Sequence, residues 1–242
     1  MVHRLFRLGL YTKELLVPEI EERPVLIPGP DHPRRVLGTG PPGLVRSASD
    51  TDLFHTSRHS TAEHVVMCLL IGPTGSGKTL LLKRLNTAAS KGNYTDFGES
   101  PPTVPTVGTN LMTVHSTKKH EITVRELGGA MAPIWHNYYS DCQALMYVVD
   151  MSNRSQLAGA CIQLYEVLTM PLLQQTPILL ILNKMDVTGA MNRLEFDQIV
   201  RMEEVLQQLP QTVTIMESSA RDGKGLQDIA KWIQEHARPP PY

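Results

Sequence analysis

The sequence predicts an α/β fold: a mostly parallel six-stranded sheet with helices on both faces. From His64 onward, short apolar runs of strand character alternate with segments of helical periodicity. One pair of strand-like runs breaks this alternation, because only a polar turn separates them. A glycine-rich stretch, "GPTGSGKT", opens the first helical segment. Together these features favour one sheet covered on both sides, with an antiparallel hairpin at one edge.

The first strand and helix are predicted on either side of the glycine-rich stretch. The run "HVVMCLLIG" at 64–72 is almost wholly apolar, as expected of a strand that is buried on both faces. The segment "KTLLLKRLNTA" at 78–88 has leucines at helical spacing. The sequence therefore predicts a buried strand, a tight turn and a helix in succession.

The next two runs predict the hairpin. "TNLMTVHS" at 109–116 and "HEITVREL" at 120–127 are separated by a polar turn around Lys118. A connection this short joins antiparallel strands, because parallel neighbours need a longer crossover. Strand and helix patterns then alternate again. We expect strands at 143–150, 177–183 and 212–219, and helices at 155–168, 195–209 and 225–236.

The beginning of the chain has a different composition. It holds seven of the eighteen prolines within the first sixty residues, with many turn dipeptides and no sustained periodicity. We expect residues 1–62 to be a disordered extension, residues 63–237 to form the folded domain and residues 238–242 to be a proline-rich tail. An alternative for the opening segment, with Arg4, Arg7 and Lys13 among leucines, is a short basic amphipathic helix at a membrane surface or a targeting segment.

Overall composition excludes several classes of partner. The formal net charge is −1, with 23 Lys+Arg against 24 Asp+Glu, so no whole-molecule field favours nucleic acid or an anionic bilayer. The three cysteines have no paired spacing, which is typical of a reducing intracellular setting. No apolar stretch reaches the roughly 18 residues of a transmembrane helix. We therefore expect a monomeric cytoplasmic protein.

The stretch "GPTGSGKT" matches the phosphate-loop pattern G-x-x-x-x-G-K-[ST] and lies between a strand and a helix, where its mechanism requires it. Backbone N–H groups of such a loop cradle phosphates, its lysine reaches the β and γ oxygens, and its last hydroxyl binds Mg²⁺. The predicted phosphate-binding residues are Gly72, Thr74, Gly75, Ser76, Gly77, Lys78 and Thr79. The alternative is an ordinary glycine-rich turn.

The tetrapeptide "NKMD", Asn183 to Asp186, follows an apolar run and so lies at the carboxyl end of a strand, where open α/β sheets bind ligands. The Asp186 carboxylate can accept from guanine N1–H and the 2-amino group, a donor pair that adenine lacks. Asn183 would brace the pocket and Lys184 would lie along the base. Within "SSA", Ser219 and Ala220 follow the next strand, where the Ala220 N–H can meet the guanine oxygen.

These residues resemble the small GTPases, and in particular their Arf-like branch. The resemblance covers roughly 65–236 and also rests on "PTVGTN" before the hairpin, "LGG" after it and "PIWHNYYSDCQALMYVVD" beyond. It implies a Ras-like P-loop GTPase fold for residues 63–237. It also implies GTP, GDP and Mg²⁺ as ligands, and effector proteins and an exchange factor as partners.

The resemblance further assigns the switch segments. Thr106 would be the switch I threonine that binds Mg²⁺ and senses the γ-phosphate, although an ordinary turn threonine is the alternative. Gly128 and Gly129 would open switch II, with the Gly129 N–H on the γ-phosphate. The hairpin between them would be an interswitch that slides on nucleotide exchange.

Three residues depart from the pattern of this family at the reacting end of the site. Ala130 stands where a glutamine usually orients the attacking water. Glu126, which is one methylene longer, stands where an aspartate usually holds the water shell of Mg²⁺, so contact through water is one alternative and an altered Mg²⁺ geometry is the other. Thr74 stands where relatives carry Gly or Asp. We therefore expect nucleotide binding with slow hydrolysis and assign no catalytic residue.

Two functional hypotheses remain open at this point. The first is a guanine-nucleotide switch that recruits effectors in the GTP form and acts as a weak GTPase with the help of a partner. The second is a nucleotide-bound scaffold that does not cycle and acts through its surface and tails. A P-loop kinase or ATPase is disfavoured by "NKMD".

Several weaker features concern membranes and partners. Val2 replaces the glycine that myristoylation needs, and the last residues contain no prenylation cysteine, so membrane association is expected to be transient. Trp135, Tyr138 and Tyr139 either form an effector-facing patch or pack on the sheet. Residues Pro239–Tyr242 fit the P-P-x-Y form that WW domains bind.

Overall fold

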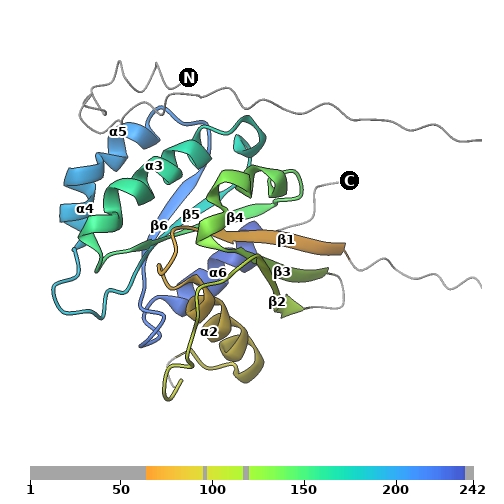
Figure 1. The fold of residues 1–242 in the computed structure, drawn as a ribbon. Coiled ribbons are helices and arrows are strands. Elements are labelled where there is room, and N and C mark those ends of the chain that lie inside the picture. The colour runs from red at the N-terminus through yellow and green to blue at the C-terminus, as the bar shows by residue number, and fades with distance from the viewer. Residues whose placement is uncertain (1–63, 95–96, 117–119, 238–242) are drawn as a thin grey trace, which may run out of the picture. The chain divides into compact units, whose positions relative to one another are not determined.

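The computed structural model describes residues 64–94, 97–116 and 120–237 (Figure 1). The expected N-terminal extension, the amphipathic-helix alternative, the turn at Lys118 and the proline-rich tail lie outside the described residues. The domain boundaries expected from the sequence therefore stay predictions.

A six-stranded sheet forms the centre of the described domain, in the order β2-β3-β1-β4-β5-β6. β2 and β3 are antiparallel and every other neighbouring pair is parallel. The predicted fold class is confirmed, including the hairpin at one edge. The strands are β1 (His64–Ile71), β2 (Thr109–Ser116), β3 (His120–Leu127), β4 (Ala144–Asp150), β5 (Ile178–Asn183) and β6 (Val213–Glu217).

Helices cover both faces of the sheet (Figure 1). α2 (Lys78–Lys91) and α6 (Leu226–His236) lie on one face, while α3 (Leu157–Leu168), α4 (Arg193–Val200) and α5 (Met202–Leu206) lie on the other. Short 3₁₀ helices connect these elements: η2 (Gly129–Tyr138), η3 (Arg154–Gln156) and η4 (Pro171–Leu173).

The central strands are buried because both of their faces are covered. Every residue of β4 and β5 is buried, which explains why their sequences are continuously apolar rather than alternating. Successive residues of β4 serve opposite faces: Met146 packs in the cluster that contains α2 and α6, whereas the Tyr147 hydroxyl donates to the Ala160 carbonyl of α3 at 2.7 Å. The carboxyl ends of the parallel strands lie on the same side of the sheet, because neighbouring strands run in the same direction.

The helical stretch expected at 195–209 is divided in the structure. Asn192 caps α4, its side-chain oxygen accepting from the Glu195 N–H at 2.9 Å. After Val200 the chain turns at Arg201, which has a left-handed φ of 51°, and α5 follows. The Tyr165 hydroxyl of α3 donates to the Val200 carbonyl at 2.8 Å. A tertiary hydrogen bond thus satisfies a carbonyl at the break, which local periodicity could not predict.

Candidate functional site

The phosphate loop connects β1 to α2 and packs against the end of β5. Gly77 caps α2 with a φ of 93°, and a Cβ at this position would lie 2.4 Å from the Asn183 Nδ2 atom. That amide donates to the Ser76 carbonyl at 2.9 Å. A glycine is required here both by the backbone conformation and by the close approach of Asn183.

Lys78 carries a buried charge inside this loop. Its side chain is 5% exposed, and its ammonium donates to the Gly72 and Pro73 carbonyls at 2.8 Å each. Burial lowers the pKa of Lys78 to about 8, and the nearby charge of Glu126 acts in the opposite direction. An ammonium held by neutral carbonyls in a partly dry site is suited to attract an anion.

The tetrapeptide "NKMD" begins at the last residue of β5, as the sequence predicted. One Asp186 oxygen accepts from the Ser219 hydroxyl at 2.7 Å, and the other lies 4.0 Å from Arg221. Lys184 has a left-handed φ of 67°, and its ammonium pairs with Asp150 at 2.6 Å. Asp186 and Lys184 therefore both lie just after the carboxyl end of β5.

Ala220 lies in the "SSA" turn that follows β6. Its N–H, expected to face the guanine oxygen, donates to the Asn183 side-chain oxygen at 3.1 Å. The Ser218 hydroxyl donates to the same oxygen, also at 3.1 Å. Asn183 is 1% exposed and so connects the phosphate loop, β5 and the "SSA" turn by side-chain hydrogen bonds.

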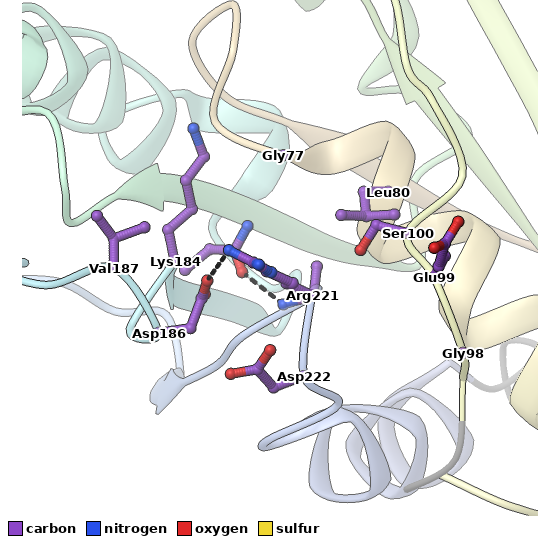
Figure 2. Close-up of a pocket in the computed structure, with 12 residues that line it drawn as sticks. Gly77, Leu80, Gly98, Glu99, Ser100, Lys184, Asp186, Val187, Arg221 and Asp222 are labelled. Carbon is purple, nitrogen blue, oxygen red and sulfur yellow. Dashed lines mark hydrogen bonds and ion pairs between the residues drawn. The ribbon is translucent and has the colours of Figure 1, made fainter.

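A cavity of about 650 Å³ is lined by Asn183, Lys184 and Asp186 of the tetrapeptide. Figure 2 shows Lys184 and Asp186 on one side of it, with Leu80 and Ser100 on the other. A second cavity of about 150 Å³ lies beside Lys78 and Thr106 and shares Gly77 and Leu80 with the first. The two cavities therefore adjoin, one at the base motif and one at the phosphate loop.

Three oxygen-bearing side chains meet beside the smaller cavity. The Thr79 hydroxyl lies 3.0 Å from the Thr106 hydroxyl and donates to a Glu126 oxygen at 2.5 Å, while the Thr106 hydroxyl donates to that oxygen at 3.1 Å. Hydroxyl and carboxylate oxygens are the hard ligands that Mg²⁺ prefers. These residues come from α2, the segment before β2, and β3, so the donor set fits Mg²⁺ although its members are far apart in the sequence.

The glycine pair after β3 packs against both the phosphate loop and the segment around Thr106. A Cβ on Gly129 would lie 2.2 Å from the Thr74 nitrogen, and a Cβ on Gly128 would lie 2.3 Å from the Thr106 carbonyl oxygen. The Gly128 N–H donates to the Gly108 carbonyl at 2.9 Å. Ala130 follows at an exposed position with only a methyl group. The segments expected to be switches thus contact each other through main-chain surfaces.

The aromatic segment mostly packs on the sheet. Trp135 and Tyr139 are buried, and the Trp135 ring meets the Tyr147 ring edge to face at 6.3 Å. The Trp135 N–H donates to the Gly128 carbonyl at 3.2 Å. Tyr138 is only half-buried, with the Arg125 guanidinium 5.5 Å from its ring centre. Trp135 and Tyr139 therefore pack in the interior and do not form an exposed effector-facing patch.

Sequence reasoning missed Arg84 and Gln156. Arg84, 3% exposed in α2, donates to the Phe97 carbonyl at 2.6 Å and to the Gly98 carbonyl at 3.3 Å, and so holds a loop that lines the larger cavity. The Gln156 amide donates to the Thr74 carbonyl at 3.0 Å. An arginine at a helical core position was a visible signal for the first, whereas no local pattern indicates the second.

A six-stranded sheet of this topology, with a phosphate loop after its first strand and N-K-x-D after its fifth, defines the class of small P-loop GTPases. The chain belongs to the ADP-ribosylation factor family, whose model matches residues 53–237. It is therefore a GTP-binding small GTPase, a member of a class of nucleotide-dependent regulatory switches that work with effectors and exchange factors.

Individual relatives agree with this assignment. The chain is 44% identical to human ADP-ribosylation factor-like protein 16 over 168 residues, which are 69% of this chain and 84% of that protein. It is 31% identical to ADP-ribosylation factor-like protein 1 of Saccharomyces cerevisiae, over 68% of this chain and 84% of that protein. A solved structure of the Arl6 (BBS3) small GTPase from Trypanosoma brucei, with bound GppNp, matches at 23% identity with a TM-score of 0.59, over 72% of this chain and 98% of that one. This last likeness supports the fold.

Within 64–94, 97–116 and 120–237, each helix is too short or too polar to cross a bilayer.

Proposed function

We propose that the chain is a guanine-nucleotide switch that recruits effectors in its GTP form and hydrolyses GTP slowly because Ala130 replaces the water-orienting glutamine. The observation that carries this proposal is the direct link between the two halves of the site. Asn183, the first residue of the guanine tetrapeptide, donates to the Ser76 carbonyl of the phosphate loop across 107 residues of sequence. One ligand that has both a guanine and phosphates suits adjoining cavities with these two linings.

The base-binding role falls to the residues at the ends of β5 and β6. Asp186 would accept from the guanine edge through the oxygen that faces the cavity, while Ser219 holds its other oxygen. Lys184 would lie along the base, and Asn183 and Ala220 would brace the pocket through their mutual hydrogen bond.

The phosphate-binding role falls to the loop from Gly72 to Thr79 and to Gly129. Lys78 would exchange its carbonyl partners for phosphate oxygens, because a buried ammonium gains more from an anion than from a neutral acceptor. Thr79 and Thr106 would hold Mg²⁺, together with Glu126. Mg²⁺ held there would offset the negative charge of the phosphates.

Slow turnover follows from what borders the γ-phosphate end of the site. The Ala130 methyl can neither donate to nor accept from an attacking water. The Thr74 side chain lies beside Gly129, where a Cβ would be 2.6 Å from the Thr74 hydroxyl oxygen. This crowding leaves little room for a second group to be inserted between the phosphate loop and switch II.

Exposed apolar side chains lie on and beside the proposed switch segments, where an effector could bind. Val104 is 79% exposed and Val107 is 98% exposed in the segment around Thr106, and Leu111 of β2 and Ile134 of η2 are also exposed. Exposed apolar side chains on segments that respond to the γ-phosphate can report the nucleotide state to a partner.

The alternative is a nucleotide-bound scaffold that does not cycle. The two hypotheses differ in whether residues 99–108 and 128–139 respond to the γ-phosphate. We propose to measure amide hydrogen exchange of the full chain with GDP and with a non-hydrolysable GTP analogue. A switch should show greater protection of both segments with the analogue, with β4 and β5 unchanged.

Lys78→Ala serves as the control for this experiment. Without the ammonium, stable binding of either nucleotide should be lost, so both segments should exchange alike under the two conditions. Identical protection in the wild-type protein, with both nucleotides demonstrably bound, would leave only the scaffold. A Lys78→Ala protein that still purified with nucleotide would remove the loop lysine from the proposed site.

The remaining expectations stay predictions of the sequence. They are the domain limits at 63–237, binding of a WW domain at Pro239–Tyr242, the monomeric state, and action in the cytoplasm with transient membrane contact.

A further inference from the structure

Glu126 is a fully buried carboxylate whose hydrogen-bond partners are all neutral. It is 0% exposed near the end of β3, opposite Asn110 in the β2–β3 pairing. One of its oxygens accepts from Thr79 and Thr106, and the other from the Asn110 amide at 3.4 Å. Lys78 is near enough to interact with its charge, but the Lys78 ammonium is hydrogen-bonded to the Gly72 and Pro73 carbonyls. A carboxylate in such surroundings is costly to bury without a cation.

Three oxygen-bearing side chains also converge beside the smaller cavity. Thr79, Thr106 and Glu126 make three mutual oxygen–oxygen contacts of 2.5, 3.0 and 3.1 Å, and all three residues line that cavity. Hydroxyl and carboxylate oxygens are the hard ligands that Mg²⁺ prefers.

The spacing of the three oxygens matches a particular coordination geometry. In octahedral Mg²⁺ coordination with bonds of about 2.1 Å, adjacent ligand oxygens are about 3.0 Å apart. Two of the three contacts lie within about 0.1 Å of that value, and the third, at 2.5 Å, is short enough to widen on metal binding. The three oxygens thus approximate one triangular face of an octahedron.

We propose that Glu126 is a direct ligand of the nucleotide-associated divalent cation and completes a facial triad with Thr79 and Thr106, with no water between carboxylate and metal. This inference rests on the proposed function and proposes direct contact in place of contact through water. The extra methylene of glutamate over aspartate supplies the reach. Shortening the side chain by one methylene would withdraw its oxygens and leave space for a water.

The test counts water molecules on the metal. Mn²⁺ replaces Mg²⁺ in complexes of the full chain with a non-hydrolysable GTP analogue, and line broadening in ¹⁷O-enriched water reports the inner-sphere waters by electron paramagnetic resonance. Glu126→Asp should bind one more water than the wild type. Glu217→Asp, which makes the same shortening in β6, should match the wild type. Equal counts in wild type and Glu126→Asp would overturn the inference.

The wild-type complex alone is decisive if Glu126→Asp does not fold. Of about six octahedral positions, three go to the triad and about two to the β- and γ-phosphates, which leaves roughly one water. Two or more waters in the wild type would contradict direct ligation. If the wild type failed to bind the analogue at all, the proposed function would fall with the inference, whereas normal binding with an excess of waters overturns the inference alone.

Glu126→Gln separates a metal ligand from a structural hydrogen-bond acceptor. The amide keeps the side-chain length but loses the charge, so the Mn²⁺ affinity of the nucleotide complex should fall roughly tenfold or more. In EDTA without nucleotide, the thermal midpoint of Glu126→Gln should stay close to that of the wild type, because the amide keeps the side-chain length and an oxygen that can accept from Thr79 and Thr106. If the thermal midpoint of Glu126→Gln fell below that of the wild type by the same amount with and without metal, the role of Glu126 would be purely structural and the inference would be overturned.

Discussion

The Asp186 carboxylate is oriented by its neighbours rather than free to rotate. Ser219 holds one oxygen at 2.7 Å, and the side chain is 8% exposed at the wall of the larger cavity. The second oxygen lies 4.0 Å from Arg221, whose own side chain is 71% exposed. An exposed partner at that distance contributes little, so the second oxygen keeps its capacity to accept from a ligand.

Asp186→Asn should therefore shift nucleotide preference from guanosine to xanthosine. Xanthine has a 2-oxo group in place of the 2-amino group, and the asparagine amide can donate to it. Loss of a charge-assisted hydrogen bond should weaken GTP binding by roughly 1.5–3 kcal/mol. Equilibrium binding of fluorescent GTP and XTP measures both affinities. Asp222→Asn, at an exposed position lining the same cavity, is the matched control, and unchanged GTP affinity in Asp186→Asn would remove the residue as the guanine reader.

Ala130 allows a second prediction at the scale of one residue. A small GTPase that has the glutamine hydrolyses GTP unassisted at about 10⁻⁴ s⁻¹. The wild-type chain should be no faster, and Ala130→Gln should accelerate single-turnover hydrolysis by about tenfold, as expected for a restored positioned group. Quenched-flow or filter assays of radiolabelled phosphate release would measure this.

Met131→Gln places the same amide one residue later in η2 and should leave the rate unchanged. If the wild-type protein alone completed several turnovers per minute, another group would be orienting the water and the slow-switch mechanism would be wrong.

At the scale of elements, α2 does more than position the phosphate loop. The Arg84 guanidinium stacks over the Phe97 ring at 4.7 Å and donates to the Phe97 and Gly98 carbonyls and to the Ser100 hydroxyl. Gly223, beyond β6, lies close to the same ring, since a Cβ there would be 2.8 Å from it. The loop at 97–100 is thus held between α2 and the turn after the guanine site, and it lines the larger cavity.

Arg84→Met should accelerate nucleotide release. Methionine keeps an apolar stem of similar length but removes the donors, and loss of hydrogen bonds from a charged group costs about 1.5–3 kcal/mol, equivalent to roughly tenfold or more in rate. Dissociation of a fluorescent GDP analogue into excess GDP provides the measurement. Lys91→Met, at the exposed end of the same helix, should release nucleotide at the wild-type rate. Equal rates in all three proteins would show that the loop does not retain nucleotide.

At the scale of the whole molecule, Cys68 is buried in the core, whereas Cys142 and Cys161 are half-buried. All three thiols are free, and burial raises the pKa of Cys142 to about 12 and of Cys161 to about 11. Burial also raises the pKa of Cys68, and of Tyr139 and Tyr147 in the same core. Native thiols should therefore be largely protonated and unreactive at pH 8.

This protection predicts a loss of stability at alkaline pH. Unfolded thiols ionise near pH 9 while the folded ones stay protonated, so the folded state binds more protons and the free energy of unfolding falls as pH rises from about 9 towards 11. The lowered pKa of Lys78 acts in the opposite direction, but one group does not outweigh three thiols above about pH 9. Urea unfolding under reducing conditions at pH 7.5, 9 and 10 would measure the slope. Cys161→Ala should reduce it, and a stability that did not fall between pH 9 and 10 would contradict the burial of the thiols.

The sequence by itself determined the order of strands and helices, the edge hairpin, the phosphate loop and the guanine tetrapeptide. These features are contiguous: periodicity reports burial within one element, and each motif contains its own turn. Tertiary structure alone decided which distant groups meet. It placed Glu126 against Thr79, 47 residues away, gave the Val200 carbonyl at the helix break a tyrosine hydroxyl from α3, and placed the Ala220 N–H against the Asn183 side-chain oxygen. The physical reason is that hydrogen bonds and charge compensation depend on distances between separate elements, which follow from the packing of both layers of helices on the sheet and leave no local pattern in the chain.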